Sequence, residues 1–291
     1  MFLGNNCIVE ENIENINIEI KLFLEAVFQK HGYDFRNYSL AHIKRRILHR
    51  LSISHIESIS IMQDRVLRDP DFLQQILLDF SINVTEMFRD PDFYLAFRNE
   101  VIPILKTYPF IKIWHAGCAT GEEVYSMAIL LQEEGLLEKT QLYATDFNQK
   151  VLKHAKEGIF SVEHIKEYTQ NYIRSGGKES FSDYYTAHYD RVIMNKNLSE
   201  NVLFAHHNLV SDNVFSEVNV VICRNVLIYF ERVLQNRVVG LFKDSLLAGG
   251  VLCLGSKESL QFNEYAPLFS PLVAKEKIYR KNYMIPNLFE D

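Results

Sequence analysis

The stretch Ile111–Ser126 reads IKIWHAGCATGEEVYS, and it decides the fold expected for this 291-residue chain. It starts with four residues that suit a buried strand, continues through a loop with Gly117 and Gly121, and enters an apolar helical pattern. This order is typical of nucleotide-binding α/β sheets, where glycines let the backbone approach a ligand and helix N–H groups point toward it. The spacing is G-x-x-x-G, unlike the dinucleotide fingerprint, and Glu122 and Glu123 follow directly. We therefore expect a ligand that carries hydroxyls and positive charge rather than pyrophosphate.

The composition bounds the class of protein. With 47% hydrophobic residues, the chain can bury one large core or two smaller ones, and we expect two domains. The formal net charge of -6 gives no global reason to bind nucleic acid or an anionic membrane. The four cysteines form no C-x-x-C pair and the ten histidines show no metal-ligand spacing, so we expect a reducing compartment and no metal site.

The sequence shows no basic region followed by an apolar run at its start, and no stretch near the roughly 18 apolar residues of a membrane span. A cytoplasmic protein without direct membrane insertion is expected. Nothing in the sequence demands a dimer, so a monomer is expected.

Residues 1–80 predict a small all-α bundle. Residues 1 to about 15 show no clear period and are interpreted as a frayed leader, and helical patterns follow at 18–28, 40–52, 56–67 and 72–80. The second helix, LAHIKRRILHRLS, separates an apolar side from a cationic side. This cationic side is either an ordinary solvated surface or a docking surface for an acidic partner.

A polar connector, SINVTEMFR, leads into the second section and contains Asn83, Thr85 and Arg89. Asp90-Pro91 favours a helix start, with Asp90 as the cap and proline at the first helical position. Two interpretations of the connector stay open: a lid over a site, or an ordinary interdomain linker.

Residues 81–291 predict an α/β domain whose strands end in polar residues. Asp146 ends the second predicted strand about 25 residues after Gly121, where such folds place an acid that accepts hydrogen bonds from ribose hydroxyls. The alternative for Asp146 is a helix N-cap. We expect residues 218–230 to form a continuous apolar strand, as a parallel sheet covered on both faces requires. Its end delivers Arg224, Asn225 and Tyr229 to the edge where such folds place their chemistry.

Two further segments complete the domain. Residues from about 163 to 198 alternate more like antiparallel strands than like a helix, and we interpret them as an insertion. Residues 272–281 predict a single last strand.

Five motifs in order carry a resemblance to a known family. They are N-V-T-E-M-F-R (83–89), G-C-A-T-G-E-E-V-Y-S (117–126), A-T-D (144–146), C-R-N-V-L-I-Y-F (223–230) and G-G-V-L-C-L-G-S-K-E-S (249–259). Together they resemble the CheR family of chemotaxis receptor methyltransferases, which are S-adenosylmethionine-dependent protein-glutamate O-methyltransferases. The resemblance implies a Rossmann-like class I methyltransferase sheet with a small antiparallel β insertion, preceded by the all-α bundle.

The resemblance also implies roles for individual residues. Arg89 would lie near the transferred methyl group, Tyr229 beside the reaction centre, and Asp146 against the ribose. We add Gly117 of the glycine loop to the residues that would bind the cofactor. The full set is Asn83, Thr85, Arg89, Gly117, Glu123, Asp146, Asn208, Leu209, Arg224 and Asn225. The implied docking residues for the helical bundle of a chemoreceptor, or a related acidic signalling protein, are Lys44, Arg45, Arg46 and Arg50.

The insertion departs from one pattern in the family. The segment between Tyr172 and Leu198 is longer than in members that use a short glycine-rich turn to tether a receptor's carboxyl-terminal peptide. We therefore do not expect tethering of that kind.

Methyl transfer to a glutamate carboxylate needs no general base, because a side chain with a pKa near 4.3 is ionised at neutral pH. Two alternatives stay open: the same chemistry on another signalling protein or a small molecule, and a cofactor-binding regulatory protein without turnover. Nucleic-acid methylation fits poorly. The net charge is acidic, and R-N-V-L stands where amino-methyltransferases carry a polar-Pro-Pro-aromatic motif.

Overall fold

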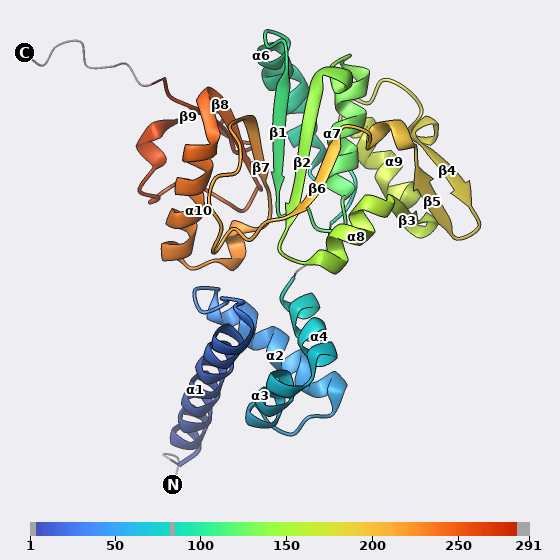
Figure 1. Cartoon of the computed structure of the whole chain (residues 1–291). Coiled ribbons are helices and arrows are strands. Elements are labelled where there is room, and N and C mark those ends of the chain that lie inside the picture. Colours follow the sequence, from blue (N-terminus) through green and yellow to red (C-terminus); the bar gives the residue numbers. More distant parts are fainter. Residues whose placement is uncertain (1–3, 82–84, 284–291) are drawn as a thin grey trace, which may run out of the picture. The chain divides into compact units, whose positions relative to one another are not determined.

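The computed structural model describes residues 4–81 and 85–283, and the chain divides into two units (Figure 1). The first, called here the helical unit, comprises Met1–Ile82 and Tyr229–Leu234. The second, called the sheet unit, comprises Asn83–Ile228 and Gln235–Asp291. A short piece of the chain between two sheet-unit segments thus belongs to the helical unit, which the sequence pattern did not predict.

The helical unit contains α1 (Gly4–His31), α2 (Leu40–Ser54), α3 (Ile59–Arg68) and α4 (Pro70–Phe80). Ser58 caps α3 and Asp69 caps α4, because each side-chain oxygen accepts backbone N–H groups of the first turn. The apolar stripes of the four helices meet in one core. Its fully buried residues include Ile20, Phe23, Val27, Ile47, Met62, Val66, Phe72 and Ile76.

The expected frayed leader is wrong from Gly4 onward, where α1 begins. Ile13 and Ile16 precede the buried Ile20 at spacings of three and four residues, so they continue the helical period toward the N-terminus. Once the later turns of a helix are fixed by packing, adding a further residue costs little because only nucleation is unfavourable.

The sheet unit is built on a seven-stranded sheet with the order β6-β2-β1-β7-β8-β10-β9. The strands from β6 to β8 pair in parallel, and β10 pairs antiparallel with both β8 and β9. This confirms the Rossmann-like sheet. The strand bounds are β1 (Ile111–Ala116), β2 (Thr140–Asp146), β6 (Val202–His206), β7 (Val218–Cys223), β8 (Leu246–Leu254), β9 (Phe269–Val273) and β10 (Ile278–Lys281).

The single last strand expected over 272–281 is wrong. The chain turns after Val273 and returns as β10, so the segment contributes to a hairpin. Lys277 adopts a left-handed backbone conformation with φ 56° at this turn. A lysine-rich apolar run does not reveal such a turn, because the usual glycine or asparagine signal is missing.

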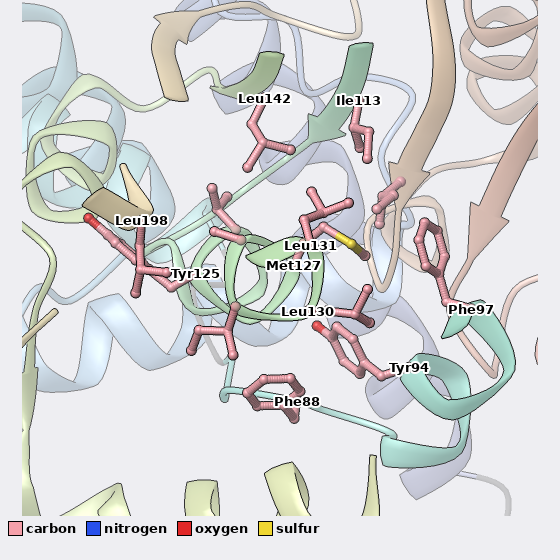
Figure 2. Close-up of a cluster of buried hydrophobic side chains, with 14 of the residues drawn as sticks. Phe88, Tyr94, Phe97, Ile113, Tyr125, Met127, Leu130, Leu131, Leu142 and Leu198 are labelled. Atoms are coloured by element: carbon pink, nitrogen blue, oxygen red, sulfur yellow. The ribbon is translucent and has the colours of Figure 1, made fainter. Parts of the chain in front are cut away.

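Helix α7 (Glu122–Glu133) lies at the centre of a cluster of buried hydrophobic side chains in the sheet unit (Figure 2). Ile113 and Leu142 approach it from the sheet, and Phe88 and Tyr94 approach it from the opposite side. The covering segment continues through α5 (Pro91–Ala96), a π-helical turn (Phe97–Val101) and α6 (Ile102–Leu105). Helices α8 (Gln149–Glu157) and α10 (Arg232–Ser245) complete the main elements around the sheet.

The expected small antiparallel sheet is present, with β5 (Arg191–Met194) between β3 (Ile159–Ser161) and β4 (Tyr185–His188). The strands β4 and β5 belong to the insertion, whereas β3 directly precedes it. The expectation that residues 163–198 avoid helix is wrong, because α9 spans Ile165–Arg174. Tyr168 and Tyr172 are four residues apart and both buried, so they share one face of α9.

A buried glutamate joins the insertion to α7. Glu133 forms a buried ion pair with Arg98 and accepts hydrogen bonds from the hydroxyls of Tyr172 and Tyr184 and from the backbone N–H of Lys178. These three donors lie in the middle of the insertion, so the carboxylate fixes that part of it against α7.

Among residues 4–81 and 85–283, no helix combines the length and apolar character needed to cross a membrane. The same residues contain no group of three or more His, Cys, Asp or Glu side chains arranged to hold a metal ion.

Phe88 provides a test of the core. Its side chain is fully buried, with ring centroids 5.1 Å from Tyr94 and 5.2 Å from Tyr172. Phe88→Ala should lower the free energy of unfolding by about 3–5 kcal/mol, because a cavity would remain between α7 and α9. Urea denaturation measures this change. Phe110→Ala, at a side chain 53% exposed, should change it by less than about 0.5 kcal/mol. Equal denaturation midpoints for the two variants would contradict the packing described.

Candidate functional site

The glycine loop between β1 and α7 depends on both of its glycines. Gly117 and Gly121 have φ of 80° and 97°, a region that only glycine enters without cost. A Cβ on Gly117 would lie 2.8 Å from a methyl carbon of Val226, and one on Gly121 would lie 3.0 Å from the Cβ of Ala155. The N–H of Gly117 also donates to the carbonyl of Thr145 at 2.8 Å. The loop is therefore fixed against the ends of neighbouring elements.

Asp146 lies buried at the end of β2, 8% exposed. Its two carboxylate oxygens accept the backbone N–H groups of Asn148 at 3.0 Å and of Ala119 at 3.2 Å. Burial raises the pKa of Asp146, while these donors act in the opposite direction. Because Ala119 is in the glycine loop, the carboxylate joins this loop to the segment that begins α8. The N-cap alternative for Asp146 is wrong, since Asn148 is the residue that caps α8.

A chain of hydrogen bonds and ion pairs links the ends of β1 and β7 to α7 and to the start of α5. The Nδ1 of His115 lies 2.9 Å from one oxygen of Glu123, and the other oxygen accepts from Arg224 at 3.3 Å. Arg224 also pairs with Asp90 at 2.7 Å and lies over the ring of Phe93, 4.1 Å from its centroid. Burial raises the pKa of Glu123, but its hydrogen bond and attraction to His115 and the charge of Arg224 leave it below the ordinary value. Glu123 is thus held as a carboxylate.

The predicted helix start is confirmed, with Asp90 at the N-cap position and proline directly after it, but the Asp90 side chain does not cap the helix. The φ of Asp90 is 55° and its side chain makes no capping hydrogen bond. The buried guanidinium of Arg224 competes for the carboxylate, and a charge-assisted bond is about twice as strong as a neutral one. The same guanidinium donates to the carbonyl oxygen of Arg89 at 3.1 Å. Arg224 therefore fixes the backbone that carries Arg89.

The ends of four adjacent strands place several predicted residues at one edge. The pairs Asp146 with His206 and Ala116 with Thr145 bring the ends of β6, β2 and β1 together, and β7 lies beside β1. Residues that follow these ends must share the edge because parallel strands end on the same side of a sheet. The predicted residues placed there are Gly117, Glu123, Asp146, Asn208, Leu209, Arg224 and Asn225.

The two asparagines of this set are held by carboxylates. The backbone N–H of Asn208 donates to Asp212 at 2.9 Å, and that of Asn225 donates to Glu258 at 2.9 Å. Asn225 has φ of 61°, a left-handed conformation that asparagine adopts more readily than most residues. Leu209 directly follows Asn208 in the sequence, and its side chain is buried, 6% exposed.

The connector is described only in part. Thr85 and Arg89 are half-buried, and Asn83 lies outside the described residues. The choice between a lid and a linker therefore stays a prediction.

Tyr229 belongs to the helical unit, whereas the predicted residues at the sheet edge belong to the sheet unit. Its carbonyl accepts the N–H of Ser39 at 2.8 Å, and the N–H of Glu231 donates to the carbonyl of Asn37 at 2.9 Å. The ring of His42 on α2 meets the Tyr229 ring edge-on, with centroids 5.1 Å apart. The helical unit thus holds the residue predicted to stand beside the reaction centre.

The predicted docking residues on α2 differ in how they are bound. Arg50 forms a two-pronged ion pair with Asp79, with N···O distances of 2.5 and 2.7 Å, and is 14% exposed. This places Arg50 in the packing of the helical unit. Arg45 is exposed, and Lys44 and Arg46 are half-buried.

Sequence reasoning missed three residues that build the site: His115, Asp90 as an ion-pair partner, and Glu258. The signal for Glu258 was present, since it lies inside the motif G-S-K-E-S. His115 had no such signal, because a histidine in a strand is usually an ordinary core residue.

The residues fit one class of cofactor. Phosphate sites leave the N–H groups of a helix N-terminus open to the ligand, whereas α7 begins with two glutamates, of which Glu122 is 7% exposed. A buried Asp146 at the end of β2 suits ribose hydroxyls. This acidic edge fits a nucleoside that carries positive charge and no phosphate, as S-adenosylmethionine does. The fold and the edge together define a methyltransferase that uses S-adenosylmethionine.

Comparison with family models makes the assignment specific. Residues 83–272 match the model described as the S-adenosylmethionine-binding domain of CheR methyltransferase. Residues 18–81 match the all-alpha domain of CheR methyltransferase. The chain belongs to the CheR methyltransferase family, and its cofactor is S-adenosylmethionine.

Curated relatives agree with this family. A Pseudomonas putida protein, provisionally named methyltransferase Cher3, is 55% identical over 268 residues, covering 92% of this chain and 98% of its own. A chemotaxis protein methyltransferase of Listeria innocua is 27% identical over 85% of this chain and 92% of its own. Chemotaxis protein methyltransferase 2 of Vibrio cholerae is 28% identical over 82% and 84%.

The pKa of Glu122 gives a test of the edge. Burial raises it from 4.5 to about 7. The folded state therefore binds more protons than the unfolded state between these pH values, and stability falls as pH rises through that window. Glu122→Gln removes this ionisation. From pH 5 to 8 the variant should gain about 1–3 kcal/mol relative to wild type in the free energy of unfolding.

Urea denaturation at several pH values measures the gain. Glu157→Gln, at an exposed position of α8, should keep a constant offset from wild type. Parallel pH profiles for wild type and Glu122→Gln would contradict the burial of an ionisable group at position 122.

Proposed function

We propose that this protein transfers a methyl group from S-adenosylmethionine to the side-chain carboxylate of glutamates in chemoreceptors. The products are glutamate methyl esters and S-adenosylhomocysteine, and the role is adaptation in chemotaxis. Support comes from the family and from two relatives named as chemotaxis methyltransferases. The observation that carries the proposal is the bond from buried Arg224 to the carbonyl of Arg89. This bond fixes the backbone of Arg89, the cation that we propose orients the acceptor carboxylate.

The residues of the chain supply positions rather than proton transfer. The cofactor supplies the methyl group as a sulfonium substituent. An acceptor glutamate with a pKa near 4.3 arrives already ionised, so no general base is required. Arg89 orients the carboxylate by a charge-assisted bond and Tyr229 by a hydroxyl bond. Alignment of reactants contributes on the order of 7–11 kcal/mol of barrier reduction.

A covalent relay through cysteine does not fit the site. Cys118 in the glycine loop and Cys223 at the end of β7 are both buried. Burial raises the pKa of each thiol well above its ordinary value, so neither provides a thiolate at neutral pH. Direct transfer from cofactor to acceptor is the step these residues support.

The acceptor we propose is an acidic helical bundle. The net charge of -6 makes the chain as a whole unfavourable for an acidic partner, so local positive charge on α2 has to provide the attraction. Arg45 is exposed there and Lys44 is half-buried beside it, whereas Arg50 is bound to Asp79. Docking therefore depends on the Lys44–Arg46 part of α2.

Two other functions compete with this proposal. One is the same methyl transfer to a carboxylate of another signalling protein, which has the same site and differs only in the acceptor. The other is a regulatory protein that binds the cofactor without turnover. A methylation assay with isolated receptor fragments and with other acidic proteins separates all three.

Cofactor binding is tested with S-adenosylhomocysteine and titration calorimetry. Asp146→Ala should weaken binding by about 1–3 kcal/mol, because buried hydrogen bonds to the ribose are lost. Asp190→Ala, at an exposed turn of the insertion, should bind like wild type. Asp146→Ala binding as tightly as wild type would contradict the ribose role, and no binding by folded wild type would refute the cofactor site.

Acceptor orientation is tested with Arg89→Ala. Methyl ester formation on a receptor fragment should slow on the order of 10- to 100-fold, because the acceptor carboxylate loses its alignment. Mass spectrometry of base-labile esters measures the rate. Arg174→Ala, at the exposed end of α9, is the matched control. If Arg89→Ala bound S-adenosylhomocysteine normally and methylated at the wild-type rate, the role given to Arg89 would be wrong.

A further inference from the structure

Glu258 is a buried carboxylate whose hydrogen-bond partners are backbone N–H groups. It follows β8 in the motif G-S-K-E-S and is 4% exposed. One oxygen accepts the backbone N–H groups of Asn225 at 2.9 Å and Gly255 at 2.5 Å. The other accepts those of Val226 at 2.9 Å and Ile228 at 3.3 Å. Three of these four donors belong to the turn that follows β7.

The turn needs this acceptor because its backbone has no regular partner. A buried N–H group left unpaired costs about 1–3 kcal/mol. Asn225 is in the left-handed region, with φ of 61°, which carries a further cost for a residue other than glycine. The Glu258 carboxylate offsets both costs by gathering successive N–H groups onto one anion.

The approach of the two turns leaves no spare room. A Cβ on Gly255 would lie 2.8 Å from the backbone nitrogen of Asn225 and 2.9 Å from its side-chain nitrogen. It would also lie 2.8 Å from a carboxylate oxygen of Glu258. Glycine at 255 thus lets the turn after β8 press against Asn225, so a change at Glu258 is transmitted directly to Asn225.

We propose that Glu258 is the positioning residue for Asn225, and that cofactor affinity depends on it through this turn. The inference rests on the proposed cofactor role of Asn225. Successive backbone N–H groups at a strand end are a common site for phosphate and other anions. The Glu258 carboxylate fills that site from within the protein. The same residue therefore shapes the edge for the cofactor and closes it to phosphate-bearing ligands.

Glu258→Gln is the sharpest test because it keeps the shape of the side chain. In the glutamine, an NH2 group would replace one of the two oxygens. This NH2 group would lie opposite two backbone N–H donors and could accept neither of them. Affinity for S-adenosylhomocysteine, measured by calorimetry on the full chain, should fall at least about tenfold, which is 1.4 kcal/mol. Glu264→Gln is the matched control, because Glu264 is exposed and its carboxylate accepts a hydrogen bond from the side chain of Asn236. It should bind like wild type.

A double variant separates positioning from a general loss of stability. Asn225→Gly keeps the left-handed backbone and removes the side chain. If Glu258 acts through Asn225, adding Glu258→Gln to Asn225→Gly should cost clearly less affinity than Glu258→Gln costs alone. Full additivity of the two losses would overturn the proposal. Should Glu258→Gln fail to fold, Glu258→Asp retains the charge and is used in the same cycle.

The outcomes distinguish this inference from the proposed function. No binding of S-adenosylhomocysteine by folded wild type would overturn both. Tight binding by wild type and equally tight binding by Glu258→Gln would overturn the role of Glu258 alone and leave the function in place.

Discussion

The buried guanidinium of Arg224 is the interaction on which the site depends. A charge that is 2% exposed would be costly alone. It is retained because Glu123, Asp90 and the ring of Phe93 surround it. These partners come from α7, from the start of α5 and from α5 itself, so one cation ties together segments far apart in the sequence. Removing a single partner from such a buried pair typically costs about 3–5 kcal/mol, because the remaining charge stays uncompensated.

Carboxylates at the edge where the parallel strands end also accept hydrogen bonds from backbone N–H groups. Asp146 accepts N–H groups from the glycine loop and from the start of α8, and Glu258 accepts four from two neighbouring turns. Loops at the ends of parallel strands have no ladder to complete, so their N–H groups need other acceptors. Using side-chain anions for this purpose makes the edge acidic. An acidic edge favours a cationic nucleoside over a phosphorylated one.

The sequence predicted the sheet, the glycine loop, the helical bundle and the small antiparallel sheet because each rests on local pattern. Alternation, apolar runs and glycine spacing are visible within ten or so residues. The helix start at Asp90-Pro91 was predicted correctly, but the capping bond of the Asp90 side chain was not, because the competing partner, Arg224, is 134 positions away in the sequence. Helix α9 was missed because its tyrosines were counted as strand formers, whereas their spacing of four is helical.

The positioning residues escaped prediction for a related reason. Glu258 lies inside a recognised motif, but its bonds run to a turn about 30 residues earlier, so the motif alone does not show which N–H groups the carboxylate accepts. His115 lies in a strand whose neighbours are apolar, so its contact with Glu123 depends on how α7 packs on the sheet. Which unit holds Tyr229 is equally a matter of tertiary contact. Residue types at strand ends indicate where a site is, but the contacts that hold those residues are set by the fold.

The segment Tyr229–Leu234 gives the chain an unusual connectivity. The polypeptide leaves the helical unit once near residue 82, re-enters it at Tyr229 and leaves again at Leu234. The two family models meet between residues 81 and 83, whereas the helical unit of the structure also includes residues 229–234. Two pieces cut at the boundary of the family models therefore do not correspond to the two structural units. A graft cut between residues 81 and 83 would separate Tyr229 and Glu231 from the backbone of Ser39 and Asn37 with which they pair, so residues 229–234 have to be transferred together with the bundle.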